Sequence, residues 1–372
     1  MAAAAGDPLG SPRGAAGRYP AGAHVSSTQD VIVVGAGVTG LALADRLRHA
    51  GLQVLVLEAR DRVGGRLLSA ADRSGAATLD LGASWCWPDE PRVRALVARL
   101  GLPMHEQHIV GDAMYQDASG TQRLAGNPID GRALRFSSGA QSLAHALAAR
   151  LDGSILLSSP VSSIRVVGGA SVEVEHANGC AYARYAVVAL PPALAVAQIG
   201  FDPPLPPALA ALASGTPVWM GAMTKVVAEY AAPFWREAGL AGAAMSHAGP
   251  LRELHDLCGP HGQPAAIFGF APAEATMEPA AVIGQLVALF GEAAAAPLAL
   301  HTQCWRAEQW TSPPAVERLA NYATFGDPRY RQAIHSRLWL GSTETAPAHP
   351  GHIEGALESA AAIGDAITAA AG

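Results

Sequence analysis

The sequence lacks the cysteine patterns of disulfide-rich and zinc-binding proteins. Only four cysteines occur in 372 residues, at positions 86, 180, 258 and 304. Their wide spacing includes no CxxC pair, which argues against a zinc site and against a disulfide framework. We therefore expect no bound metal, and reduced thiols in a cytoplasmic protein.

Charged residues and long apolar runs are also scarce. Charged residues make up 15% of the chain, the formal net charge is −6, and no run of Lys or Arg is present. A nucleic-acid partner would require a basic patch, so we expect none. The most apolar long segment, residues 280–300, contains Gln285 and Glu292, which indicates a packed helix rather than a membrane span. We expect no membrane contact, and composition alone defines no oligomeric state.

The chain is long enough and apolar enough to form a large hydrophobic core. Half of its residues are apolar, and its length suits one large domain or two interleaved domains with a substantial core. Residues 1–28 are rich in Ala, Gly, Pro and Ser and contain no continuous apolar segment. We interpret them as a disordered extension rather than a signal peptide.

A dinucleotide-binding motif follows this extension. The apolar run 30–34 has the length of a strand, GAGVTG comes next, and apolar positions then recur at helical spacing until Gly51. A second strand at 53–57 completes a βαβ unit. Such units form parallel sheets covered by helices, with ligands bound at the carboxyl ends of the strands.

The three glycines and the acidic residue of this motif each have a physical role. Gly35 allows a tight reversal, Gly37 lets the backbone approach a pyrophosphate, and Gly40 lets the helix pack on the strand. The helix start offers free N–H groups to phosphates. Glu58 ends the second strand, 23 residues after Gly35, where its carboxylate can accept both hydrogen bonds of a ribose. These residues predict a dinucleotide and leave NAD and FAD both open.

Three further segments resemble the flavin-containing monoamine oxidase family. They are EARDRVGGRLLS at 58–69, LDLGASWCWP at 79–88 and STETAPAHPGHIEGALESA at 342–360. The resemblance implies FAD, with Arg66 at the pyrophosphate and Leu81 to Ser84 beside the flavin. It also implies that Glu344 lies near the phosphates and ribityl chain. His352 and the helix start after it would face the isoalloxazine and stabilise negative charge on reduced flavin.

The resemblance also covers the middle of the chain, where SSPVSSI places Val161 at the adenine and EQWTSPP places Trp310 beside the flavin. The cofactor contacts predicted from the motif and the resemblance together are Gly35, Gly37, Val38, Thr39, Gly40, Glu58, Ala59, Arg60, Gly65, Arg66, Gly82, Ala83, Ser84, Val161, Trp310, Glu344, His352 and Ile353.

Lys225 takes the position of the family's active-site lysine, in the segment GAMTKVVAEYAAPFW. It lies in an apolar strand, where burial would shift its pKa. The resemblance gives it a water bridge to flavin N5 and a part in the reaction of reduced flavin with oxygen. Tyr322 and His352 take the two positions of the family's aromatic substrate cage, so only one aromatic residue of the pair is retained.

Some differences from the family also carry information. Monoamine oxidases that bind FAD covalently do so through a cysteine, and Asn321 takes that position here. An asparagine forms no thioether, so we expect non-covalent FAD. The segment between Leu100 and Ser137 is also short for the family, so the chain resembles a shortened member. A substrate cannot be inferred from the resemblance.

The predicted fold is α/β, with a Rossmann-like FAD-binding domain interleaved with a discontinuous α+β substrate domain. The FAD-binding domain is predicted at 29–104, 138–215 and 326–372, and the substrate domain at 105–137 and 216–325. Strand 338–340 and helix 353–369 could rejoin the first sheet, whereas residues 103–127 look polar and irregular.

The function implied by the resemblance is that of an FAD-dependent amine oxidase. Hydride would pass from the amine α-carbon to flavin N5, the imine would hydrolyse, and O2 would be reduced to H2O2. A flavin desaturase or an amino-acid oxidase is an alternative, because the same fold serves those reactions; an amino-acid oxidase would need an arginine such as Arg252 or Arg306 in its pocket. A non-catalytic flavin-binding pathway partner is another.

Overall fold

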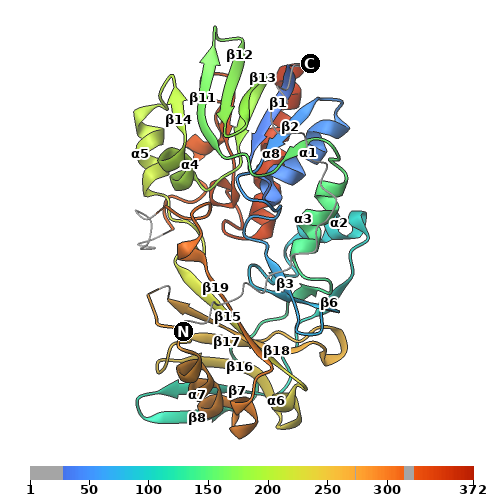
Figure 1. Ribbon diagram of the computed structural model, residues 1–372, viewed down its shortest axis with the longest axis vertical. Coiled ribbons are helices and arrows are strands. Elements are labelled where there is room, and N and C mark those ends of the chain that lie inside the picture. Colours follow the sequence, from blue (N-terminus) through green and yellow to red (C-terminus); the bar gives the residue numbers. More distant parts are fainter. Residues whose placement is uncertain (1–27, 273, 314–321) are drawn as a thin grey trace, which may run out of the picture.

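The computed structural model describes residues 28–272, 274–313 and 322–372. Most of the predicted N-terminal extension therefore lies outside the described residues. Figure 1 shows two lobes, each built around its own large β-sheet. The chain passes between the lobes several times, because the lower lobe contains residues 112–124 as well as residues 223–304.

The sheet of the upper lobe has eight strands. The strands in its middle are parallel: β1 pairs in parallel with β2 and β13, and β13 also pairs in parallel with β20. A meander of β11, β12 and β13 extends it in antiparallel fashion. In spatial order the strands are β10 (Ile155–Leu156), β2 (Val54–Leu57), β1 (Gln29–Val34), β13 (Gly179–Val188), β12 (Ser171–His176), β11 (Val161–Val167) and β14 (Gly200–Asp202), with β20 (Leu338–Leu340) beside β13.

Helices cover both faces of this sheet, which explains why β1 and β2 are continuous apolar runs. Val31 and Val33 face one core, and Ile32 and Val34 face the other. The first core is closed by α1 (Val38–His49), α2 (Pro91–Leu100), α3 (Gln141–Ala149) and α8 (Ile353–Ala371), and the second by α4 (Pro192–Gln198) and α5 (Pro207–Gly215).

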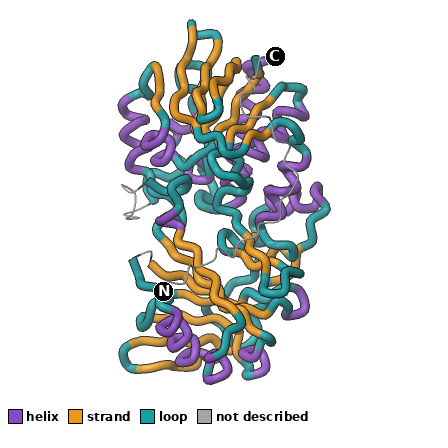
Figure 2. The backbone as a smooth tube through the Cα atoms, viewed as in Figure 1, coloured by secondary structure: helices purple, strands orange, loops and turns teal. Residues whose placement is uncertain are grey.

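The lower lobe contains a seven-stranded sheet with β15 near one edge and a hairpin at the other (Figure 2). Its strands, in order, are β19 (Ala299–Cys304), β15 (Met223–Tyr230), β18 (Ala265–Pro272), β17 (Glu253–Asp256), β16 (Leu240–Ser246), β7 (Asp112–Asp117) and β8 (Gly120–Leu124). Helix α7 (Pro279–Phe290) packs on this sheet through Val282, Leu286 and Leu289, and α6 (Phe234–Glu237) is a short helix beside it.

Two small sheets lie where the lobes meet. One is the hairpin of β3 (Ser69–Ala71) and β4 (Thr78–Asp80), and the other joins β5 (Trp85–Cys86), β9 (Leu134–Phe136) and β6 (Met104–Glu106). Leu79 and Leu81 of the upper lobe pack against Val227 and Phe268 of the lower sheet. The loop after β4 is therefore fixed to both lobes.

The predicted α/β fold class is confirmed, and so is the return of the last strand and helix to the first sheet. The two large sheets take their strands from the two sets of ranges predicted for the domains, although the domain bounds themselves stay a prediction. The interpretation of residues 103–127 as irregular was wrong, because they form β6, β7 and β8. Their polarity reflects an exposed edge, since four of the five β8 residues are exposed.

The apolar segment near residues 280–300 is a packed helix, as the sequence predicts. Among the residues that the structure describes, no helix combines the length and the apolar character needed to cross a bilayer.

Close packing of the dinucleotide turn on α1 makes Gly40 a sensitive position. A Cβ at Gly40 would lie 2.0 Å from the carbonyl oxygen of Gly35. We expect Gly40→Ala to lower the free energy of unfolding by about 1–3 kcal/mol, because the helix must move away from the turn. Urea unfolding measures this change.

Gly284→Ala is the matched control, because its Cβ on α7 meets nothing within 4 Å. This variant should keep or raise the free energy of unfolding by up to about 1 kcal/mol. Equal losses in the two variants would show that contact between the turn and α1 does not constrain the fold.

Candidate active site

A cavity of about 510 Å³ lies between the upper sheet, the loop after β4 and the lower sheet. It begins at the dinucleotide turn and ends beside β15, β17 and β18. The predicted cofactor residues that line it are Gly35, Gly37, Val38, Thr39, Glu58, Ala59, Arg60, Gly65, Arg66, Gly82, Ala83, Ser84, Val161, Trp310, His352 and Ile353. Lys225 lines it as well, whereas Gly40, Glu344 and Tyr322 do not.

The dinucleotide turn has the backbone that its glycines predict. Gly35 has φ +105°, and a Cβ there would lie 2.9 Å from the carbonyl oxygen of Ala189. Gly37 faces open space, with no atom within 4 Å of its Cβ position. Helix α1 begins there without a side-chain cap or an acidic residue in its first turn. Its N–H groups and its dipole therefore suit a phosphate.

Glu58 is buried at the end of β2 and fixes the same turn. One carboxylate oxygen accepts a hydrogen bond from the Ala36 N–H at 2.7 Å, and the other accepts one from the Arg60 N–H at 2.9 Å. A carboxylate has about four acceptor positions, so it can accept further bonds from a ribose. Turn, helix and carboxylate together fit the adenosine diphosphate part of FAD.

Arg66 lines the cavity and forms an ion pair with a buried carboxylate that does not line it. Its guanidinium donates to both oxygens of Glu344 at 2.6 and 3.0 Å, and also to the carbonyl oxygen of Trp219 at 3.1 Å. Burial tends to raise the pKa of Glu344, but the charge and hydrogen bonds of Arg66 outweigh it and the pKa is lowered. Glu344 therefore orients Arg66 from behind, while Arg66 itself lines the cavity.

Lys225 is almost completely buried, with 1% of its surface exposed. Its Nζ donates to the Gly82 carbonyl oxygen at 3.0 Å and to Ser84 Oγ at 2.6 Å, and lies 4.1 Å from the centre of the Phe268 ring. An ammonium group has three N–H donors, so one remains for a ligand or a water molecule.

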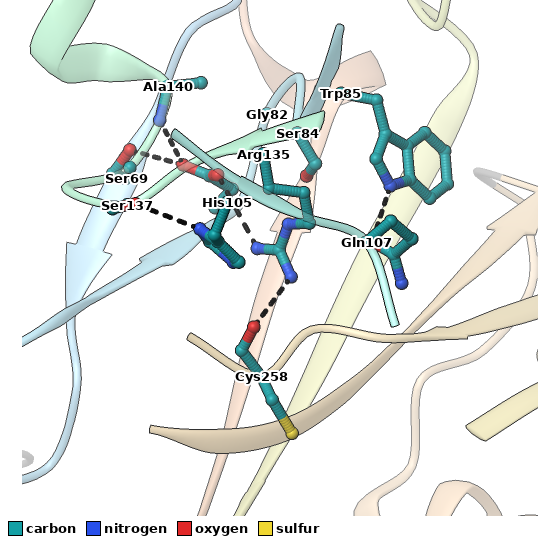
Figure 3. A network of polar contacts seen from close by, with 12 residues as sticks. Ser69, Gly82, Ser84, Trp85, His105, Gln107, Arg135, Ser137, Ala140 and Cys258 are labelled. Carbon is teal, nitrogen blue, oxygen red and sulfur yellow. Dashed lines mark hydrogen bonds and ion pairs between the residues drawn. The ribbon is translucent and has the colours of Figure 1, made fainter. Parts of the chain in front are cut away.

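A buried ion pair lies behind this lysine. Asp80 accepts hydrogen bonds from Ser69 Oγ and the Ala140 N–H, and its other oxygen is 3.9 Å from Arg135 Nη2. Figure 3 shows Arg135 reaching toward the Cys258 carbonyl oxygen, next to the loop of Gly82 and Ser84. Burial and, to a smaller extent, the charge of Arg135 lower the pKa of Lys225 to about 7, although the charge of Asp80 opposes them.

His352 precedes α8 and belongs to an aromatic wall. Its Nδ1 is 2.7 Å from Glu90 Oε1, and its ring stacks on Trp87 with centroids 4.7 Å apart. The ring centroid of Trp219 lies 6.2 Å from that of His352 and 5.4 Å from that of Tyr322. Tyr322, 47% exposed, therefore packs behind Trp219 rather than on the cavity. The predicted substrate cage of Tyr322 and His352 stays a prediction.

Sequence reasoning missed several lining residues, namely Trp85, Trp87, Trp219, Glu253 and Phe270. The two tryptophans of the SWCWP segment follow the LGAS loop directly, so their position in the sequence could have indicated them. No local sequence pattern marks Trp219 or Glu253 as a lining residue. Asn321, the basis of the non-covalent prediction, lies outside the described residues.

Comparison with known proteins gives a consistent result. A family model described as flavin containing amine oxidoreductase matches residues 38–128 and 110–367. A Mycobacterium tuberculosis protein assigned as the flavin-containing monoamine oxidase AofH is 28% identical, over 89% of this chain and 95% of that protein. Putrescine oxidase from Kocuria rosea is 26% identical, over 90% and 94%. These relatives are longer, since the AofH alignment spans 441 positions.

The fold is shared with cyclohexylamine oxidase from Brevibacterium oxydans. The TM-score is 0.81 at 23% identity, with 93% of this chain and 100% of that chain covered. This agreement extends over both lobes, because so little of either chain is left out.

The lowered pKa of Lys225 makes folding stability depend on pH. Between about pH 7 and 10.5 the folded chain holds a neutral lysine and the unfolded chain a protonated one. The unfolded state then binds more protons, so the free energy of unfolding rises with pH across this window. We expect the free energy of unfolding of Lys225→Met to rise less steeply with pH across this window, as measured by urea unfolding of the flavin-free protein. The same slope in both proteins would contradict the lowered pKa.

Proposed function

The chain belongs to the flavin-containing amine oxidoreductase family, and we propose that it is an FAD-dependent oxidase of small amines. The observation that carries the proposal is Lys225, buried at the inner end of a cavity that begins at a dinucleotide turn. A lysine with a pKa of about 7 is uncommon outside functional sites.

The residues present fit the cofactor along its length. The N-terminus of α1 and Arg66 would hold the pyrophosphate, and Glu58 would hold the ribose. The N-terminus of α8 would face the isoalloxazine, because His352 and Ile353 line the cavity and the helix has no side-chain cap. When bound, FAD would accept a hydride from the amine α-carbon, and O2 would then reoxidise it to give H2O2.

We propose that this FAD is held without a covalent bond. All four cysteines lie within the described residues, and none of them lines the cavity. Burial raises the pKa of both Cys86 and Cys258 to about 12, so these two thiols are poor nucleophiles. Asn321 at the family's tether position supports the same conclusion from sequence.

Lys225 would exchange a proton at the inner end of the cavity. Its two hydrogen bonds fix Nζ toward the loop of Gly82 and Ser84, and the third N–H of the ammonium is left for a water molecule or a ligand. A pKa of about 7 lets it hold or release a proton near neutral pH. This proton would support the reduction of oxygen, and the imine product would hydrolyse in water.

The aromatic wall would orient the amine. His352, held by Glu90 through Nδ1, presents the rest of its ring to the cavity beside Trp87. Trp219 supplies the second aromatic surface, and Tyr322 supports Trp219 from behind. A neutral amine can lie against these rings, and their faces favour positive charge that develops as it is oxidised.

An amino-acid oxidase has one observation in its favour, because Arg252 borders the cavity. Its Nη1, however, donates to the carbonyl oxygens of Gly249 and Leu251. Arg306 is not among the lining residues. Because Nη1 of Arg252 is engaged with the backbone, we propose an amine without a carboxylate.

The proposed function predicts that an amine reduces the bound flavin. Under anaerobic conditions, a panel of primary amines, diamines and amino acids should include members that bleach the flavin absorbance, and admission of air should release H2O2. Lys225→Met should be reduced by the same amine but reoxidise more slowly, on the order of 10- to 100-fold. Bleaching by dithionite but by no amine would reject an amine oxidase and leave the flavin-binding partner.

Non-covalent binding predicts that the yellow colour leaves the protein on denaturation. Acid precipitation should give a colourless pellet and a supernatant that contains all the FAD. The control is Cys86→Ser, which removes a cysteine that does not line the cavity and should behave identically. Colour retained in the washed pellet would contradict this prediction.

A further inference from the structure

Glu253 lies in the same cavity as Lys225, on a neighbouring part of the lower sheet. Lys225 of β15 pairs with Phe270 of β18, which in turn pairs with Glu253 of β17. Residues directly opposite on adjacent strands point to the same face of a sheet. All three line the cavity. Two strand spacings, or about 9.5 Å, separate the backbones at Lys225 and Glu253.

A buried histidine holds the carboxylate of Glu253 in place. His255 Nε2 is 2.9 Å from Glu253 Oε1, and His255 Nδ1 is 2.5 Å from Asp130 Oδ1. Trp85 and Phe268 pack around the imidazole at 4.9 and 5.2 Å between centroids. Burial tends to lower the pKa of His255, but the two carboxylates outweigh it and the pKa is raised. The ring is thus an imidazolium that donates to both carboxylates.

Glu253, His255 and Asp130 together carry a net negative charge, and Glu253 is the member that lines the cavity. Two carboxylates and one imidazolium sum to −1, and the hydrogen bond from His255 holds the pKa of Glu253 below its usual range. The Glu253 side chain is 45% exposed, whereas Asp130 is 4% exposed. Across the described ranges no hydrogen bond to Glu253 Oε2 occurs, so this oxygen is available to a ligand.

Among the described residues, no arginine lies within ion-pair distance of this carboxylate, whose one ion-pair partner is His255. Arg252 precedes Glu253, but its Nη1 donates to backbone carbonyl oxygens. Glu253, Phe270 and Lys225 form a row across three neighbouring strands, and Phe270 in the middle offers an apolar surface. The row therefore presents an anion, an apolar surface and the reactive end of the cavity, in that order.

We propose that Glu253 binds a second cationic group of the substrate, so that the substrates are diamines or polyamines with a short alkyl spacer. This inference rests on the proposed function. One amine would be oxidised at the Lys225 end, the spacer would cover Phe270, and the distal ammonium would pair with Glu253 Oε2. A monoamine of equal length would leave this carboxylate facing a methyl group, which loses the ion pair and part of the carboxylate's hydration.

The experiment compares 1,4-diaminobutane with 1-aminopentane, in which a methyl group replaces the distal ammonium. The FAD-loaded parent should prefer the diamine in kcat/KM. Glu253→Gln should lower kcat/KM for the diamine by about 10- to 100-fold, mainly through KM. The kcat/KM for 1-aminopentane should stay unchanged or rise, because an amide loses less hydration than a carboxylate when it faces a methyl group. Glu253→Asp should recover part of the loss, and Glu106→Gln, at an exposed glutamate, should match the parent.

A binding measurement gives a second readout independent of turnover. Millimolar 1,4-diaminobutane should raise the melting temperature of the parent and of Glu106→Gln, but not that of Glu253→Gln. Equal kcat/KM for the two amines in the parent, or equal losses for both in Glu253→Gln, would overturn the diamine inference alone. Failure of every amine to bleach the parent's flavin would reject the proposed function, and the inference with it.

Discussion

The burial of one cation between the two lobes is the constraint on which the site depends. Lys225 comes from the lower sheet, and both of its hydrogen-bond acceptors belong to the loop that follows β4 of the upper lobe. A buried ammonium without partners would be strongly unfavourable. The lobes must therefore meet where Gly82 and Ser84 can reach Nζ, and this contact closes the inner end of the cavity.

The remaining polar groups at this junction act on the same cation. Asp80 lies two residues before Gly82, and Arg135 joins it to the Cys258 carbonyl oxygen of the lower lobe. Burial and Arg135 favour the neutral amine of Lys225, whereas Asp80 favours the ammonium. The balance places the lysine where it can exchange a proton near neutral pH. One junction thus fixes both the shape of the cavity and its acid–base character.

Much of the upper lobe was predictable because its signals are local. The apolar strand, the three glycines and Glu58 lie within thirty residues of one another, and their roles follow from the geometry of a single βαβ unit. The apolar strand around Lys225 was also predicted, and it is β15, Met223–Tyr230, because apolar and β-branched residues mark a strand of this kind. The hairpin β7–β8 was missed because exposed edge strands are polar and resemble loops.

The sequence by itself determined the dinucleotide motif, the family and the presence of a lysine in an apolar strand. Only the tertiary structure decided which groups surround that lysine, because Gly82, Ser84 and Asp80 are more than 140 residues away in the chain. The same holds for Glu253, whose charge faces the cavity only because β17, β18 and β15 pair in one register. Strand register and the meeting of two lobes are long-range properties, and no local pattern encodes them.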